Sequence, residues 1–336
     1  MRLPPPIRLN RRGLRRALRA ASELLGAPWA PTPFASFAAR AQGVIEIDAF
    51  GSNPGQLRML VYVPPEPPRP GAPVVMLLHG CGQDAAAFAA QSGWMAVAEQ
   101  NRLPLLLPEQ TAGNNRHRCF NWFRPGDTRR GRGELLSLRQ MLAEAKRRFG
   151  SDPARSYVVG LSAGGAMAAS LLAAYPEAFA AGAVVAGLPV GTASSISEAV
   201  LRMHHADVTV PAAEWEARLR RAAPPRFSRN WPRLSIWHGS EDRVVDPRHA
   251  EIMAAQWTAV HGLAGPPVID ARVPPEARHQ VWGNPGAAAV ELWTIGGMGH
   301  GFPIDAREGG TPGPFVVEAG IGATQWIARS WGLRQG

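Results

Sequence analysis

Short apolar runs alternate along this chain with longer stretches in which apolar positions recur at helical spacing. The run Val74–Leu78 is apolar throughout and lies between Pro73 and His79. This pattern is typical of a strand buried on both faces of a parallel sheet. Comparable patterns predict further strands at Leu57–Val63, Leu103–Leu107, Ser156–Gly160, Ala183–Ala186, Leu234–Trp237 and Val290–Ile295.

Helical segments are predicted between these strands. They are Ala85–Glu99, Glu134–Phe149, Gly164–Ala174, Pro247–Val260 and Phe315–Trp331. The alternation predicts βαβ units, and hence an α/β fold with a mostly parallel central sheet and helices on both faces. Residues 188–230 interrupt the alternation, so we interpret them as a small insertion above the sheet that shapes a substrate pocket.

The most informative motif is Gly160-Leu161-Ser162-Ala163-Gly164, which joins a predicted strand to a predicted helix. This G-x-S-x-G sequence in a strand–turn–helix context is the pattern of a nucleophile elbow. A sharp turn brings the strand and the helix close together, and bulky neighbours of the serine would clash there. Ser162 is therefore the candidate nucleophile, at a helix N-terminus. A glycine-rich turn without chemistry is the alternative.

A nucleophilic serine needs a base, and the base needs an orienting acid, in the chain order Ser, acid, His. Asp242 follows a predicted strand directly and is the candidate acid, with Glu241 and Asp246 as rivals.

His300 is the candidate base, because the glycines on either side of it allow close approach to a neighbouring loop. The rival His279 lies in a stretch rich in Pro and Arg, with no predicted strand before it.

The loop His79-Gly80-Cys81-Gly82-Gln83 follows the buried strand and predicts an oxyanion hole. Backbone N–H groups of Cys81 and Ala163 are the expected donors, with Gly82 as an alternative to Cys81. His79 is interpreted as structural.

The chain has two cysteines, Cys81 and Cys119. A disulfide between them would close a loop of about 39 residues and contribute a few kcal/mol to stability. The cysteine count alone slightly favours two free thiols.

The net charge of +10 is concentrated at the start of the chain, where seven arginines and no acid occupy the first 20 residues. The remainder carries only +3, so a nucleic-acid partner is not expected. Residues 1–42 are predicted to be a basic tail with a short amphipathic helix, and residues 43–336 a single catalytic domain. The tail is interpreted as a solvated segment, with contact to an anionic membrane surface as the alternative.

No cofactor or metal is expected, since no His/Cys/Asp cluster has ligand spacing.

The chain resembles the poly(3-hydroxybutyrate) depolymerase-type esterases of the α/β-hydrolase superfamily, which are related to feruloyl and acetylxylan esterases. The matching segments are LLHGCGQDAAAFA (77–89), PEQ (108–110), CFNWF (119–123), RGRGE (130–134), GLSAGGAMAA (160–169), AGLPVG (186–191), HGSEDRVV (238–245) and MGHGFP (298–303). They occur in the family's order. The resemblance implies an α/β-hydrolase fold, with Ser162 as nucleophile, Asp242 as acid and His300 as base.

The resemblance further implies a disulfide between Cys81 and Cys119, which reverses the preference for free thiols. It also implies that Trp122 belongs to an aromatic substrate wall. From their positions in the sequence, Phe123 and, in or next to the insertion, Leu188, Trp215 and Trp231 would add to this wall. The alternative is that the tryptophans fill the core.

The expected enzyme is a serine carboxylic-ester hydrolase that acts on hydroxyalkanoate oligomers or similar short esters. A feruloyl or acetylxylan esterase is the alternative, and outside enzymes a non-catalytic α/β-hydrolase-like binding protein. The family resemblance implies export, yet the sequence shows no ordinary signal peptide, so a cytoplasmic location is the alternative. No polymer-binding domain is recognised, which favours soluble substrates over solid polyester.

Overall fold

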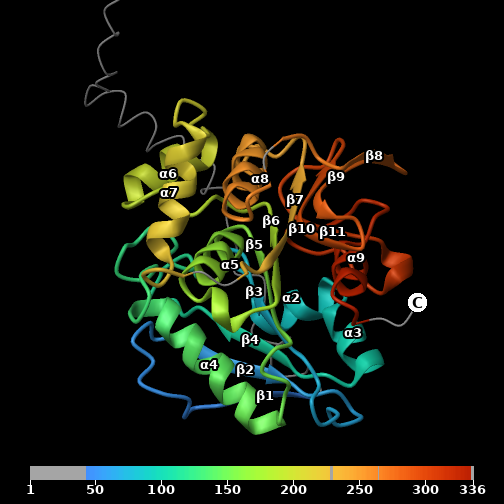
Figure 1. Ribbon diagram of the computed structural model, residues 1–336. Helices are drawn as coiled ribbons and strands as arrows, with labels where there is room; N and C mark the ends of the chain where they lie inside the picture. Colours follow the sequence, from blue (N-terminus) through green and yellow to red (C-terminus); the bar gives the residue numbers. More distant parts are fainter. Residues whose placement is uncertain (1–42, 228–229, 264, 334–336) are drawn as a thin grey trace, which may run out of the picture.

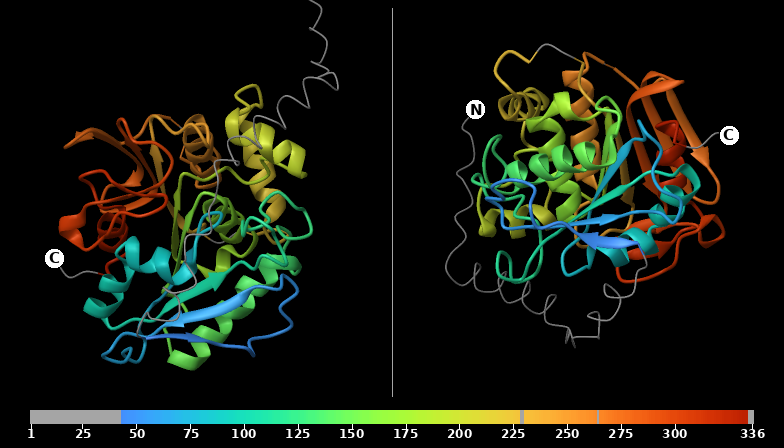
Figure 2. Two further views of the ribbon diagram at one scale, coloured as in Figure 1. Left: turned by 180° about the vertical axis from the view of Figure 1, so that it is seen from behind. Right: turned by 90° about the horizontal axis from the view of Figure 1, so that it is seen from below.

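The structure is a computed structural model that describes residues 43–227, 230–263 and 265–333. The predicted basic tail, residues 1–42, lies outside the described residues. Within them, a ten-stranded sheet has the order β1-β2-β4-β3-β5-β6-β7-β10-β9-β8, and β11 pairs with β12 in a small second sheet. The two edges of the large sheet, β1 in blue and β8 in orange, lie on opposite sides of the molecule (Figures 1 and 2).

The strands of the described chain are β1 (Val44–Glu46), β2 (Arg58–Tyr62), β3 (Val74–Leu78), β4 (Leu105–Glu109), β5 (Ser156–Leu161), β6 (Ala181–Val185), β7 (Arg233–Gly239), β8 (Ile269–Val273), β9 (Ala277–Asn284), β10 (Ala287–Ile295), β11 (Phe302–Ile304) and β12 (Val316–Glu318). The α-helices are α2 (Ala85–Gln91), α3 (Trp94–Asn101), α4 (Gly133–Phe149), α5 (Ala163–Ala174), α6 (Ile196–His204), α7 (Ala212–Ala222), α8 (Arg248–Val260) and α9 (Ala323–Ser330).

The centre of the sheet is parallel, from β4 through β3, β5, β6 and β7 to β10. Antiparallel strands extend it at both edges. All five residues of β3 are buried, because Val74 and Met76 face one apolar core while Val75 and Leu77 face the other. The first core is covered by α4, α5 and α8, and the second by α2, α3 and α9 (Figure 1). The α/β-hydrolase fold class predicted from the sequence is therefore confirmed.

The helix predicted over Ala85–Glu99 is two helices. The chain breaks between α2 and α3 at Gly93, which has a φ of +82°. A backbone in this left-handed region does not continue a right-handed helix.

Two other predictions about elements were wrong. The closing helix predicted from Phe315 begins only at Ala323, because Val316–Glu318 forms β12 against β11. The antiparallel strands β8 and β9 were not predicted, and no strand was expected before His279, whereas β8 precedes it and His279 itself lies within β9. The edge strand β8 has no buried residue, and its neighbour β9 has only Ala277 and Val281 buried, so both lack the continuous apolar run of the central strands.

The predicted insertion lies between β6 and β7 and carries α6 and α7. The α7 helix packs against α8 and α5 (Figure 1).

Candidate active site

Ser162 occupies the sharp turn between β5 and α5. Its backbone has φ +57° and ψ −117°, and its N–H donates to Val185 O at 2.9 Å. A Cβ atom on Gly160 would collide with the carbonyl of Gly164, and one on Gly164 with the carbonyls of the chain at the end of β3. Only glycine fits at either position, so the G-x-S-x-G spacing is a steric requirement of this turn.

The loops after β7 and β10 are tied together by backbone contacts. The Ser240 N–H donates to Ile295 O at 2.9 Å, and the Glu241 N–H donates to Met298 O at 3.0 Å. Gly239 permits this approach, because a Cβ there would overlap the Met298 carbonyl.

This packing brings Asp242 and His300 into contact. His300 Nδ1 lies 2.7 Å from Asp242 Oδ2, and both side chains are almost fully buried. Ser162, Asp242 and His300 follow β5, β7 and β10, which are parallel strands. All three residues therefore lie beyond the carboxyl ends of these strands, on the same side of the sheet.

The Asp242 carboxylate is surrounded by hydrogen-bond donors. Its Oδ1 accepts from the N–H groups of Val244 and Val245, each at 2.8 Å. Its Oδ2 faces His300 and also His238 Nε2, at 3.1 Å. Burial acts to raise the pKa of Asp242, but the hydrogen bonds from His238 and His300 outweigh it and hold the pKa well below its usual range.

The rival residues make other contacts. Asp246 binds Arg248 at 2.5 Å and the Ala206 N–H at 2.9 Å. Glu241 is exposed. His279 lies 3.0 Å from Glu291 on the neighbouring strand β10 and stacks on Trp293. Among these candidates, the structure brings together only Asp242 and His300.

The loop after β3 lies against the start of α5, as the contacts around Gly164 show. The N–H of Ala163, the first residue of α5, has no carbonyl in a preceding turn to bind. The Gly82 N–H donates to His117 O at 2.8 Å and is thus occupied. Of the two expected donors in this loop, the Cys81 N–H is the one that the described residues leave available.

Cys81 and Cys119 form a disulfide, with their Cα atoms 4.2 Å apart. The pairing that the family resemblance implies is therefore present, and the cysteine count alone pointed the wrong way.

His79 also connects the loop after β3 to Gln110, which follows β4. Its Nδ1 lies 2.7 Å from Gly80 O, and its Nε2 accepts from the Gln110 N–H. Complete burial lowers the pKa of His79 to about 4, so this residue is neutral at pH 7.

Trp122 and Phe123 follow the disulfide and pack edge to face, with ring centroids 5.6 Å apart. Both residues are buried, at 7% and 9% exposed. Leu188, Trp215 and Trp231 are also buried.

Glu134 is a fully buried polar residue that the sequence did not single out. Its carboxylate accepts from side-chain amides of Gln110, Asn114 and Asn121 and from the Asn121 N–H. It therefore holds the segment that carries Trp122. Burial raises the pKa of Glu134 to about 7. The RGRGE motif contains this residue, but its spacing does not reveal that the carboxylate is buried.

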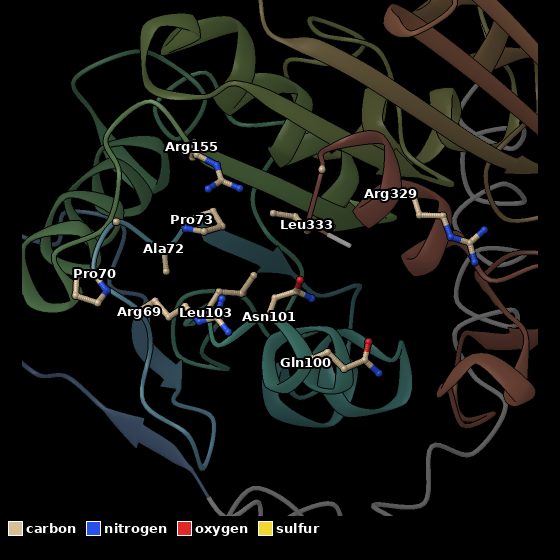
Figure 3. A pocket seen from close by; sticks show the side chains of 12 residues that line it. Arg69, Pro70, Ala72, Pro73, Gln100, Asn101, Leu103, Arg155, Arg329 and Leu333 are labelled. Carbon is tan, nitrogen blue, oxygen red and sulfur yellow. The ribbon is translucent and has the colours of Figure 1, made fainter. Parts of the chain in front are cut away.

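A hollow of about 850 Å³ lies away from Ser162, Asp242 and His300. Figure 3 shows Pro73, Arg155 and Leu333 among its lining residues. Pro73 and Arg155 directly precede β3 and β5, so the hollow is at the amino ends of these strands. Ser162 follows the opposite end of β5, about 20 Å away along the strand. The hollow is not part of the candidate active site.

In the part of the chain that the structure describes, no group of three or more His, Cys, Asp or Glu side chains is arranged to hold a metal ion. The helices of that part are too short or too polar to cross a membrane.

Residues 57–282 match the model of the family described as Esterase PHB depolymerase. The chain is 38% identical over 309 residues to a poly(3-hydroxyalkanoate) depolymerase C of Paucimonas lemoignei, covering 90% of this chain and 73% of that protein. It is 32% identical over 270 residues to an acetylxylan esterase of Coprinopsis cinerea, covering 78% and 70% respectively.

Among solved structures, an acetyl xylan esterase from Aspergillus awamori superposes with a TM-score of 0.73 at 21% identity, covering 87% of this chain and 99% of that one. This likeness supports the fold, and the sequence relatives support the chemistry. The chain belongs to the Esterase PHB depolymerase family and is a serine carboxylic-ester hydrolase.

Proposed function

We propose that Ser162, His300 and Asp242 form the catalytic triad of this esterase. The hydrogen bond from His300 Nδ1 to Asp242 Oδ2 carries the proposal, because it leaves Nε2 as the nitrogen that takes the proton of Ser162. The bond lies beyond the carboxyl ends of the parallel strands, as does the turn that carries Ser162.

In the proposed reaction, Ser162 Oγ attacks the ester carbonyl while His300 accepts its proton. The tetrahedral oxyanion is stabilised by the N–H groups of Cys81 and Ala163. His300 then protonates the leaving alcohol, and water hydrolyses the acyl-enzyme by the same sequence in reverse.

The proposed substrates are hydroxyalkanoate oligomers or similar short esters. The relative from Paucimonas lemoignei, named as a depolymerase of poly(3-hydroxyalkanoate), supports this class. The acetylxylan esterase relative supports acetylated or feruloylated saccharides as a second candidate class. We propose Trp122 and Phe123 as one wall of the acyl site. We also infer that residues 43–336 act as one catalytic domain, because one ten-stranded sheet runs from β1 to β10 and the segment that follows it, with β11 and α9, packs into the second core of that sheet.

The test compares Ser162→Ala with Ser170→Ala. Ser170 lies on the same helix, and its Oγ donates to Ala166 O, away from the turn. We expect Ser162→Ala to lose labelling by a fluorophosphonate probe and nearly all esterase activity, while Ser170→Ala keeps both. Hydroxybutyrate oligomers, acetylxylan and feruloyl esters, assayed side by side, distinguish the substrate classes. Full activity in Ser162→Ala would overturn the assignment, as would inhibition by EDTA that added metal reverses.

A further inference from the structure

His238 is a buried histidine that contacts the proposed triad without belonging to it. It lies near the end of β7 and is 2% exposed. Its Nε2 is 3.1 Å from Asp242 Oδ2 and 3.1 Å from Val245 O. The same carboxylate oxygen receives His300 Nδ1 at 2.7 Å. One oxygen atom of Asp242 thus serves two histidines.

The protonation of His238 follows from its partners. A carboxylate oxygen and a backbone carbonyl are both acceptors, so Nε2 must carry a proton to bond with either. His238 is therefore in its Nε2–H form, and this proton is shared between Val245 O and Asp242 Oδ2.

Together these groups surround the buried carboxylate. Oδ1 accepts from two backbone N–H groups, and Oδ2 lies 2.7 Å from His300 Nδ1 and 3.1 Å from His238 Nε2, whose one proton it shares with Val245 O. If His238 were absent, only His300 would hold Oδ2. Because His300 changes its protonation state during the proposed reaction, a partner that keeps its own proton would hold the carboxylate at a constant angle to the imidazole.

We infer that His238 is a positioning residue, the second donor that holds Asp242 Oδ2 in place for His300. The inference rests on the proposed triad. It gives a role to the first histidine of the segment HGSEDRVV, which the triad assignment leaves unused.

The test compares His238→Met with His238→Gln. Methionine retains much of the side-chain volume but cannot donate a proton, whereas the glutamine amide nitrogen can donate from near the position of Nε2. The matched control is His261→Met. His261 follows α8, and its Nε2 donates to Pro232 O at 3.2 Å, so this variant also loses a bond from a partly buried histidine to a backbone carbonyl.

Rates are divided by the number of sites that the fluorophosphonate probe titrates, so unfolded protein does not enter the comparison. We expect kcat per site to fall about 10- to 100-fold in His238→Met, with KM changed less than about twofold. His238→Gln should recover most of the loss, and His261→Met should keep the wild-type kcat per site.

Wild-type kcat per site in His238→Met would overturn the inference. So would equal losses of kcat per site in His238→Met and His238→Gln that follow their melting temperatures, because the role would then be structural. Failure of the proposed triad is a separate result, since it would appear as activity and labelling in Ser162→Ala.

Discussion

Replacing Asp242 with asparagine changes one oxygen atom to an NH2 group at a site surrounded by donors. Oδ1 accepts from two backbone N–H groups and Oδ2 faces two histidines. The amide introduced by Asp242→Asn would have to turn its NH2 toward one of these pairs. The variant therefore cannot reproduce the wild-type hydrogen bonds in either orientation.

The expected loss of kcat in Asp242→Asn follows from the effect of each amide orientation on His300. With the NH2 group toward the imidazole, Nδ1 must accept, so the proton moves to Nε2 and His300 cannot accept the serine proton. With the NH2 group toward Val244 and Val245, two backbone donors lose their acceptor, at about 1–3 kcal/mol each. The first orientation avoids that penalty. We therefore expect kcat to fall about 10⁴-fold, which corresponds to about 5.5 kcal/mol of transition-state stabilisation.

The matched control is Asp246→Asn in the same loop. Asp246 is paired with Arg248 and makes no contact with His300. This variant should keep kcat within about threefold while losing some thermal stability. Steady-state kinetics on a soluble short-chain ester, with active sites titrated by the fluorophosphonate probe, measures both variants. Near-normal activity in Asp242→Asn, or a dead Asp246→Asn, would refute the assignment of the acid.

Three further predictions concern the walls of the site and the polar group beneath them. Reduction of the Cys81–Cys119 disulfide, whose cysteines are 38 residues apart, should destabilise the fold by about 4 kcal/mol and lower kcat/KM as well; a melting temperature within about 2 °C of the oxidised protein would contradict this. Trp122→Ala should lower kcat/KM more for hydroxybutyrate oligomers than for a small acetate ester, because only the larger substrates reach that wall; an equal loss on both, following a lower melting temperature, would make Trp122 structural. Burial raises the pKa of Glu134 to about 7. Between about pH 4.5 and 7 the folded protein therefore binds one proton more than the unfolded chain. The contribution of Glu134 to the free energy of unfolding thus falls by about 3 kcal/mol as pH rises through that window. Denaturant unfolding at pH 5 and pH 8 should show that Glu134→Gln removes this slope and that the surface variant Glu144→Gln retains it; an unchanged slope in Glu134→Gln would refute the assignment.

The sequence by itself determined the features that depend on local sterics or on complete burial. The β3 run was predicted with its correct ends, because a strand covered on both faces must be apolar at every position. The elbow at Ser162 was also evident, because the turn excludes any side chain at Gly160 and Gly164. Both constraints act within a few residues, so both appear as sequence patterns.

The strands β8 and β9, at one side of the sheet, show the opposite case. The β8 strand and its neighbour β9 are held by backbone hydrogen bonds and contain few buried residues, so composition gives little sign of them. The extension of the sheet beyond β10 was therefore decided by pairing, which a single-sequence pattern does not reveal.

Tertiary structure also decided which polar residues meet. Asp242 and Asp246 are four residues apart in one loop, yet only Asp242 reaches His300, because the loops after β7 and β10 bind each other through their backbones. The donor role of His238 and the burial of Glu134 arise in the same way, from strands and loops distant in sequence. A polar side chain has the same appearance in a sequence whether it is solvated or buried. Its surroundings in the fold determine its hydrogen-bond partners and the direction of its pKa shift.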